Sequence, residues 1–401
     1  MDQKFLDNLI TSSSSKIVMI IMDGLGGLPL KPDGKTELES AKIPNMNALA
    51  FQSALGLSIP IGPGITTGSG PGHLAIFGYN PFQFEIGRGA LEALGVDFDL
   101  GPQDLAARGN FCTVDSSGVL LDRRAGRLAT ELSRNLIEIL CTIEIEGVEI
   151  FIEPVKEHRF VLVMRAPGLG EYLSDTDPLK IGVPPLPIIA GDEQSIFAAN
   201  KINQFLIQAQ KLLCDQTPAN SIMLRGFAKL PKVPSYKEKY GLNAASIAVN
   251  GMYRGVSRLA GMEVLNVPGT TLSDEFSTLE KHWNDHDFFY LHFKKTDTCG
   301  ENGDFEGKVH AIEEMDAFIP RLMALNPDVV IITGDHSSPA LLRSHSWHPV
   351  PLLIYSKVVR PDNISEFGER SCLKGSLGIM QAKDVMLIAL ANSGRLAKYG
   401  A

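Results

Sequence analysis

The length, composition and charge of this chain exclude several classes of protein. Its 401 residues exceed the size at which one hydrophobic core stops growing, so we expect a large domain and a smaller one, and 44% hydrophobic residues exclude general disorder. A formal net charge of -9 argues against nucleic acid or an anionic membrane as a partner, because phosphate surfaces attract clustered lysine and arginine.

Four short apolar runs predict buried strands, because each is bounded by polar sequence. In chain order they are residues 16–22, 288–293, 329–333 and 351–355. Helices are predicted between them, at residues 43–52, 308–325 and 382–391. This alternation is typical of an α/β protein with a mostly parallel sheet, whose ligands bind at the carboxyl ends of the strands.

The middle of the chain has a different texture. Shorter alternating strands such as 160–164, one helix at 129–141 and a proline-rich stretch at 178–187 predict an α+β domain. We predict that this inserted domain spans 105–230, so that 1–104 and 231–401 form one discontinuous core.

Carboxylates and imidazoles near the strand ends are candidate metal ligands. Asp335 and His336 directly follow a strand, and His345 and His348 precede the next one, a donor set that suits a divalent cation. Asp23, which precedes a run of glycines, taken alone fits a helix cap or a turn better. A single histidine is more often a satisfied core residue, but the number of donors together favours a metal site.

The segment after the strand at 288–293 offers further oxygen ligands. It contains Asp297, Glu301 and Asp304. The spacing does not fit an EF-hand loop, because the glycine is misplaced and a cysteine occupies the third position. A solvated acidic turn is the alternative, and it suits Asp304 better than Asp297, which is nearest to the strand.

A glycine-dense loop at residues 62–73 carries Ser69 and His73. It lacks the lysine of a P-loop and the strand-helix frame of a dinucleotide site. A serine nucleophile must be activated by a base or a metal. His73 is one candidate for the base, but the many carboxylates and imidazoles elsewhere favour a metal. A plain flexible loop is the alternative.

Arginines gather in and near the predicted insert, and their forked guanidinium groups suit phosphate and carboxylate. They are Arg88, Arg108, Arg123, Arg124, Arg127 and Arg159. Any single one fits an ordinary surface salt bridge, and we expect at least one of the three between 123 and 127 to be structural.

An ordered series of motifs resembles one known family over nearly the whole chain. The motifs are Asp23-Gly24, Gly68 to Leu74, Gly78 to Pro81, Asp122 to Arg127, Asp175 to Pro178, Thr296-Asp297, Gly334 to His336 and His345 to Pro351. Together they resemble the archaeal-type 2,3-bisphosphoglycerate-independent phosphoglycerate mutases, including their bacterial members.

The resemblance implies an alkaline-phosphatase-like α/β core with a smaller inserted α+β domain for the substrate. It also implies two divalent metal ions, commonly manganese, magnesium, cobalt or zinc, and no 2,3-bisphosphoglycerate. The implied activity is the interconversion of 3-phosphoglycerate and 2-phosphoglycerate through a phosphoserine, in glycolysis and gluconeogenesis.

The resemblance also implies roles for individual residues. One metal would be held by Asp23, Ser69, Asp335 and His336, and the other by Asp297 and His345. Ser69 would be the nucleophile, and His348 would lie behind the ligands or face the substrate. The substrate would be bound by Arg88, Arg108, Arg123, Arg127, Arg159 and His73.

Two segments depart from the family pattern. Relatives commonly have Gly-His-Asp-Gly where this chain has Gly300 to Gly303, so Glu301 replaces an imidazole. As a ligand Glu301 would favour harder cations such as magnesium or manganese; otherwise the second site is weakened. Gly70 to Gly72 stand where archaeal members often have Asp-Thr-Ala, which we interpret as a subfamily difference.

In the expected mechanism Ser69 takes the phosphate from one glycerate hydroxyl, the glycerate reorients, and the neighbouring hydroxyl recovers the phosphate. The insert would exclude water, which would otherwise hydrolyse the phosphoserine. One alternative is a metal-dependent phosphatase, or a mutase for another metabolite such as a pentose phosphate. Another is an inactive relative that senses phosphometabolites, which the replacement at Glu301 would suit.

We expect a cytoplasmic location. The apolar run before Asp23 is too short for a signal-peptide core, and no stretch approaches the roughly 18 apolar residues of a membrane span. The five cysteines form no CxxC pair, which fits reduced thiols. No oligomeric state is predicted.

Overall fold

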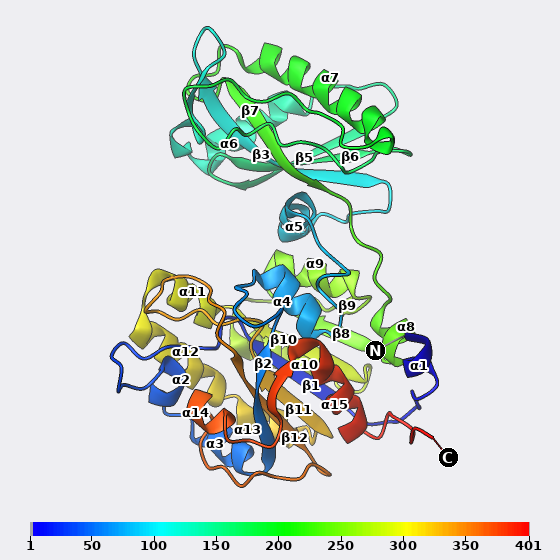
Figure 1. The fold of residues 1–401 in the computed structure, drawn as a ribbon, viewed down its shortest axis with the longest axis vertical. Helices are drawn as coiled ribbons and strands as arrows, with labels where there is room; N and C mark the ends of the chain where they lie inside the picture. Colours follow the sequence, from blue (N-terminus) through cyan, green and yellow to red (C-terminus); the bar gives the residue numbers. More distant parts are fainter. Residues whose placement is uncertain (1–2, 401) are drawn as a thin grey trace. The chain divides into compact units, whose positions relative to one another are not determined.

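The computed structural model describes residues 3–400, which divide into two compact units (Figure 1). The first unit runs to Glu85 and resumes at Lys232, and the second is Ile86–Pro231. The second unit begins before the predicted 105 because α5 (Arg88–Gly95) packs on its sheet, where Ala93 shares a hydrophobic cluster with Ala106 and Val163. Residues 1, 2 and 401 of the predicted core lie outside the described part.

The first unit is built on an eight-stranded sheet with the order β13-β2-β12-β11-β1-β10-β8-β9. All its pairings are parallel except the two that β12 makes with β11 and β2. The strands are β1 (Ile17–Met22), β2 (Ser53–Ile59), β8 (Ala244–Ile247), β9 (Glu263–Val264), β10 (Phe288–Phe293), β11 (Val329–Thr333), β12 (Val350–Ser356) and β13 (Gly378–Gln381). The four predicted strands are therefore present, and every residue of β1, β10 and β11 is buried.

Helices cover both faces of this sheet. On one face Leu49, Phe276 and Ile312, from three helices, join the largest hydrophobic cluster. On the other face Phe77 packs edge-on against Tyr290 of β10 at 4.9 Å between ring centroids. The helices are α1 (Gln3–Asp7), α2 (Glu37–Ser40), α3 (Pro44–Phe51), α4 (Ser69–Ile76), α8 (Tyr236–Tyr240), α9 (Gly251–Leu259), α10 (Leu272–Lys281), α11 (Lys295–Asn302), α12 (Phe305–Asp316), α13 (Ile319–Ala324), α14 (Glu369–Cys372) and α15 (Val385–Asn392).

Two predicted helices have different limits. The single helix expected at 308–325 is α12 followed by α13, because Pro320 stands in the first turn of α13 and has no N–H to continue the earlier helix. The helix expected at 382–391 begins with a 3₁₀ turn at Ala382–Asp384 before α15. In the described part of the chain, no helix is both long and apolar enough to cross a bilayer.

The second unit is an antiparallel sheet with its two long helices on one face and α5 on the other. Its strands are β3 (Asp104–Val114), β4 (Leu120–Asp122), β5 (Glu149–Lys156), β6 (Arg159–Arg165) and β7 (Ser221–Ala228), with β3 pairing to β4, β6 and β7. The long helices α6 (Thr130–Leu140) and α7 (Ile196–Leu213) pack on the face that carries Leu105 and Phe111. Because side chains alternate along a strand, Arg108 and Asn110 point to the opposite face.

Glu275 of α10 supports a prediction about stability. Its side chain is only 4% exposed, its Oε2 has no hydrogen-bond partner, and burial raises the pKa of this carboxyl to about 8. The folded state then holds a proton that the unfolded state has released, so the free energy of unfolding falls as the pH rises from about 4.5 to about 8. Each unit of pKa difference corresponds to about 1.4 kcal/mol.

The variant Glu275→Gln, which cannot ionise, should lose this dependence and be more stable than the parent at pH 8.5 but not at pH 5. Urea unfolding at both pH values measures the difference. Glu280→Gln changes an exposed carboxyl of the same helix and is the matched control. An equal effect of Glu275→Gln at both pH values would contradict the prediction.

Candidate active site

Asp23 begins the loop that follows β1 and is fully buried. Its Oδ2 accepts hydrogen bonds from His292 Nε2 and Lys294 Nζ, both at 3.0 Å. Its Oδ1 lies 3.3 Å from His336 Nε2. Gly24 has φ +63°, and a Cβ there would lie 2.7 Å from the hydroxyl of Ser338, so only glycine lets the chain turn here.

Asp335 and His336 follow β11, the neighbour of β1, so parallel pairing brings the two loops together. Asp335 Oδ1 accepts the backbone N–H of Gly24 at 3.1 Å, and its Oδ2 lies 3.2 Å from His336 Nε2. Ser69, the first residue of α4, places its Oγ 3.2 Å from the same imidazole nitrogen. The predicted nucleophile therefore lies beside the predicted metal ligands.

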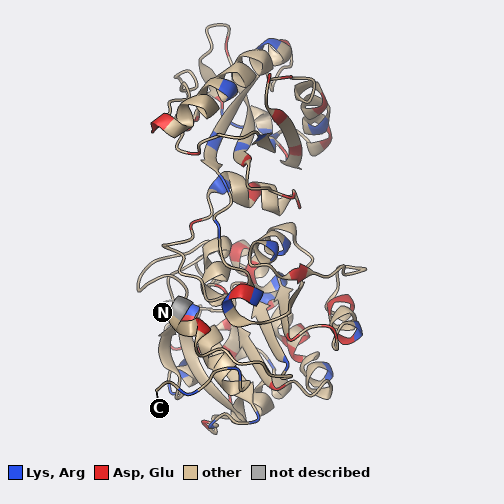
Figure 2. Ribbon diagram, turned by 90° about the vertical axis from the view of Figure 1, so that its right-hand side faces the viewer, with Lys and Arg blue, Asp and Glu red and all other residues tan. Residues whose placement is uncertain are grey.

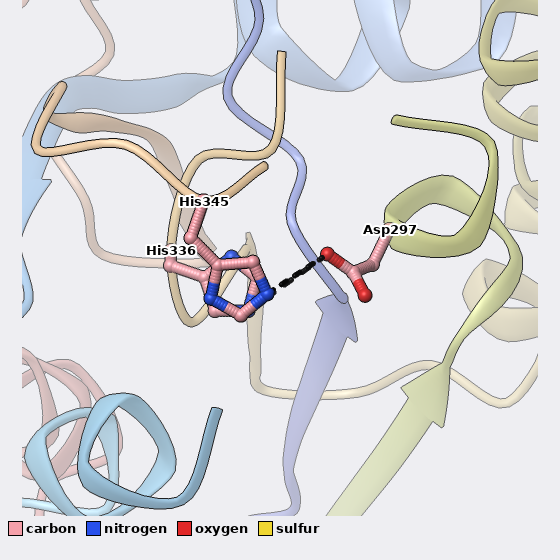
Figure 3. A group of neighbouring side chains, drawn as sticks. All are labelled: Asp297, His336 and His345. Carbon is pink, nitrogen blue, oxygen red and sulfur yellow. Dashed lines mark ion pairs between the residues drawn. The ribbon is translucent and has the colours of Figure 1, made fainter. Parts of the chain in front are cut away.

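The ligand atoms form two groups, each within 4.8 Å, that share His336: Asp23, Asp335 and His336 in one, and Asp297, His336 and His345 in the other. Figure 3 shows the second group, in which the rings of His336 and His345 stack at 3.7 Å. His345 Nε2 lies 3.5 Å from Asp297 Oδ1 and 3.4 Å from Glu301 Oε1. The two groups contain the ligand pairs that the resemblance implied.

The environment of these groups fits divalent cations. Asp23 Oδ1 and Asp335 Oδ2 are buried without a directed hydrogen bond, so each leaves a lone pair facing the site. Burial alone would raise the pKa of Asp23, but His292, His336 and Lys294 hold it well below its usual value. Burial would also lower the pKa of His336, yet the surrounding carboxylates raise it to about 9. The site therefore carries an excess of negative charge that a cation would neutralise.

Neighbouring groups orient the two imidazoles. His345 Nδ1 is hydrogen-bonded to the backbone oxygen of Thr67 at 2.8 Å, and His336 Nδ1 lies 3.1 Å from Ser338 Oγ. Both contacts occupy Nδ1 and leave Nε2 turned toward the carboxylates. This is the arrangement that usually supports histidine ligands in metal sites.

Lys294, His292 and Lys308 belong to the site but are absent from the sequence-based prediction. Lys294 Nζ bridges Asp23 Oδ2 and Asp297 Oδ2, the latter at 2.6 Å. His292 lies within an apolar run that indicates only a core strand. The position of Lys294 just beyond β10, where the other ligands follow their strands, is the one signal that could have identified it.

Lys308 connects the loop that follows β1 to the loop that follows β11. Its fully buried ammonium donates to the backbone oxygens of Gly24, Gly26 and Ser338 at 2.9, 3.0 and 2.9 Å. Burial lowers the pKa of this lysine. Three N–H groups thus meet three carbonyls, which ties the loop of Asp23 to the loop of Asp335.

One predicted position differs in the structure. His73 is fully buried, with Nδ1 at 2.8 Å from the backbone oxygen of Ser69 and 3.1 Å from Asp335 Oδ2. It is therefore placed to orient Asp335 and has no exposed atom for the substrate contact that we predicted, because α4 carries it against β10. His348, which the resemblance did not make a metal ligand, contacts Ser346 Oγ at 3.0 Å and belongs to neither ligand group.

The second unit contains a cavity of about 340 Å³ on the face opposite α6 and α7. Its lining residues are Arg108, Asn110, Arg123, Arg124, Arg127, Glu157, His158, Arg159 and Arg225. Four of the predicted substrate-binding arginines are among them, and Figure 2 marks the basic positions of this sheet in blue. Arg88 is not among the lining residues; it begins α5 beside Gly226.

Asp177 fixes one side of this cavity. It accepts two hydrogen bonds from Arg123, at 2.9 and 2.7 Å, and one from Arg225 at 3.2 Å. The fork of Arg123 is thus held in place, as a structural arginine would be, while its side chain still lines the cavity. Arg225 is a lining residue that the sequence analysis did not select.

The fold and the two ligand groups are those of a metalloenzyme. Residues 15–392 match the family model described as the metalloenzyme superfamily, so the chain is a metalloenzyme of that superfamily. A protein of Thermotoga sp. (strain RQ2), named "Probable 2,3-bisphosphoglycerate-independent phosphoglycerate mutase", is 49% identical over 100% of this chain and 99% of its own length. A protein of Aquifex aeolicus with the same name is 46% identical, over 99% of each chain.

Solved structures agree with this assignment. The cofactor-independent phosphoglycerate mutase of Thermoplasma acidophilum is 30% identical with a TM-score of 0.79, over 95% of this chain and 100% of that one. A protein of Pyrococcus horikoshii is 31% identical with a TM-score of 0.80, over 96% and 99%. The chain belongs to the family of 2,3-bisphosphoglycerate-independent phosphoglycerate mutases, and the predicted fold class is confirmed.

Proposed function

We propose that the chain interconverts 3-phosphoglycerate and 2-phosphoglycerate through a phosphoserine at Ser69. The observation that carries the proposal is the position of Ser69 Oγ, 3.2 Å from the imidazole that the two ligand groups share. A hydroxyl at the first position of a helix also faces the positive end of the helix dipole, which favours a developing negative charge. The names of the relatives support the same reaction.

In this proposal Ser69 Oγ attacks the phosphorus of the substrate, the bond between phosphorus and the glycerate oxygen breaks, and the proton lost by the serine ends on that oxygen, which leaves as a hydroxyl. The neighbouring hydroxyl then attacks the phosphoserine and restores Ser69. Two divalent cations held by Asp23, Asp335, His336, Asp297 and His345 would lower the pKa of the serine hydroxyl and offset the charge of the transferring group. Lys294 Nζ adds a fixed positive charge between the two groups.

The arginine cavity of the second unit would bind the anionic groups of the substrate. Guanidinium groups bind carboxylate and phosphate through paired hydrogen bonds, and Arg108, Arg127 and Arg159 line the cavity. Arg88 does not line the cavity, so its contact with the substrate stays a prediction. We also propose that the protein works in the cytoplasm. Its five cysteines are all free thiols, which is typical of proteins in a reducing compartment.

The carboxylates and imidazoles suit manganese, magnesium, cobalt or zinc. Glu301 is a further proposed ligand of the group formed by Asp297, His336 and His345, because its Oε1 lies 3.4 Å from His345 Nε2 and its side chain is half exposed. An additional carboxylate at this position favours manganese and magnesium over zinc.

The variant Glu301→Gln should therefore weaken the binding of one of the two manganese ions roughly ten-fold and leave the other unchanged. Calorimetric titration of the metal-free protein with manganese measures both affinities. Glu306→Gln, an exposed acidic change in the first turn of the neighbouring α12, is the control. Two unchanged affinities would remove Glu301 from the ligand set.

Incubation with 3-phosphoglycerate, coupled to enolase, tests the proposed function. We expect 2-phosphoglycerate to form in the presence of manganese, without 2,3-bisphosphoglycerate and with little free phosphate. Release of phosphate without formation of 2-phosphoglycerate would show that the protein is a phosphatase and not a mutase. Binding of phosphoglycerate without any turnover under several divalent cations would instead indicate a sensor.

A further inference from the structure

The arginine cavity contains polar atoms that a purely anionic ligand cannot satisfy. Four of its lining atoms are buried without a hydrogen bond: Arg108 Nε, Arg225 Nε, Asn110 Oδ1 and His158 Nδ1. Buried polar groups in native proteins are almost always paired, so four unpaired atoms gathered in one cavity leave hydrogen-bonding capacity that a polar ligand can use. Two of them belong to cations, and the other two belong to neutral side chains.

Asn110 and His158 are both 7% exposed, so neither can turn to bulk solvent. Asn110 stands on β3 directly opposite Arg159 of β6, in the middle of the cationic face. Burial, together with the charge of Arg159, lowers the pKa of His158, so this imidazole is neutral near pH 7. The cavity therefore combines guanidinium groups with two neutral hydrogen-bonding groups.

The chemistry of the orphan atoms specifies the ligand further. The two arginine Nε–H groups are donors and are satisfied by a carboxylate or phosphate oxygen. Asn110 Oδ1 is an acceptor, and an ionised carboxylate or phosphate has no proton to offer it. The ligand must therefore bring its own donor next to its anionic group, and a hydroxyl adjacent to a carboxylate is the simplest chemistry that does so.

We infer that Asn110 and His158 recognise the free hydroxyl of the phosphorylated hydroxy acid whose carboxylate the arginines bind. This inference rests on the proposed function and adds specificity-determining residues to it. In 3-phosphoglycerate the free hydroxyl is on carbon 2, and in 2-phosphoglycerate it is on carbon 3. The group that Asn110 and His158 bind is also the group that must receive the phosphate, so they would select substrates able to complete the transfer.

Binding of matched ligand pairs tests this inference. The first pair is 3-phosphoglycerate and 3-phosphooxypropanoate, which lacks the carbon-2 hydroxyl; the second is 2-phosphoglycerate and phospholactate, which lacks the carbon-3 hydroxyl. Calorimetry with the full chain carrying Ser69→Ala avoids turnover. We expect the hydroxylated member of at least one pair to bind roughly ten-fold more tightly or better, because its loss leaves buried polar groups unpaired.

The preference is the ratio of the two affinities within a pair. The variants Asn110→Leu and His158→Phe should lower this ratio toward one, because they weaken the binding of the hydroxylated ligand alone. His158→Gln, which keeps a hydrogen-bonding amide, should retain part of it. Arg127→Gln should weaken both members of a pair equally. Asn135→Leu makes the same change at an exposed position of α6, which covers the opposite face, and should alter nothing.

The preference is a ratio measured within one variant, so a partly unfolded sample does not distort it. A parent without any preference, or variants that keep the full preference, would overturn the inference. The enolase-coupled assay shows whether a negative result concerns only this inference or also the proposed function. If 2-phosphoglycerate forms while the preference is absent, the inference is wrong and the mutase function stands.

Discussion

Replacement of Ser69 by alanine should lower kcat in the enolase-coupled assay by at least about 1,000-fold, because it removes the oxygen that accepts the phosphate. Ser69 Oγ is the oxygen that lies 3.2 Å from His336 Nε2, and the structure carries it at the start of α4. Its removal deletes the acceptor of the phosphate while leaving every carboxylate and imidazole of the two ligand groups. The expected loss is therefore in turnover more than in metal binding.

Mass spectrometry of protein quenched during turnover should find phosphate on Ser69 of the parent and none on the variant. Thr66→Ala removes an exposed hydroxyl three positions earlier in the same loop and should keep full activity. A Ser69→Ala variant that still makes 2-phosphoglycerate at more than about a tenth of the parental rate would rule out the phosphoserine route.

The second large effect is expected from Asp335→Asn. The change keeps the shape of the side chain but removes the charge from a ligand of the group that also contains Asp23 and His336. Loss of residues that merely support ligands costs about 10–100-fold in metal affinity, so we expect at least about 100-fold here, with a matching loss of kcat/KM at limiting manganese.

A stability measurement separates this effect from simple misfolding. Burial and the charge of Asp23 oppose ionisation of Asp335, but His336 and His73 outweigh them and hold the pKa of this carboxyl below its usual value. The charge therefore stabilises the folded state at neutral pH, and the metal-free variant should be somewhat less stable than the metal-free parent, yet still folded. The rise in Tm that manganese causes in the parent should be reduced in the variant. Asp285→Asn, at an exposed surface position, is the control. An Asp335→Asn variant with an unchanged manganese response would remove Asp335 from the ligand set.

Local pattern was sufficient to predict the central strands. The runs that became β1, β10 and β11 are mostly apolar because both faces of these strands are covered. The reversed direction of β12 was not predictable in this way. A buried strand looks the same in sequence whether it runs parallel or antiparallel to its neighbours, and only the pairing of β12 with β11 and β2 reveals it.

The site residues also divide into those that local sequence identified and those that it did not. Asp23, Asp297 and Asp335 were identified because each stands at or just beyond a strand end, where parallel strands present their ligands. Lys294 and His292 were passed over, since a lysine beyond a strand and a histidine within one fit ordinary surface and core positions. The resemblance assigned His73 to the substrate, but α4 carries its side chain into the core.

The amino-acid sequence by itself determined which side chains are available for chemistry, the strands that present them and the family to which they belong. Those properties depend on residue type and short-range spacing. Only the tertiary structure decided that His336 stands between two ligand groups, that Lys308 joins their loops, and that the arginine cavity has neutral groups in it. Each of these depends on residues far apart in the chain, which meet only because the sheets pair their strands in one particular order.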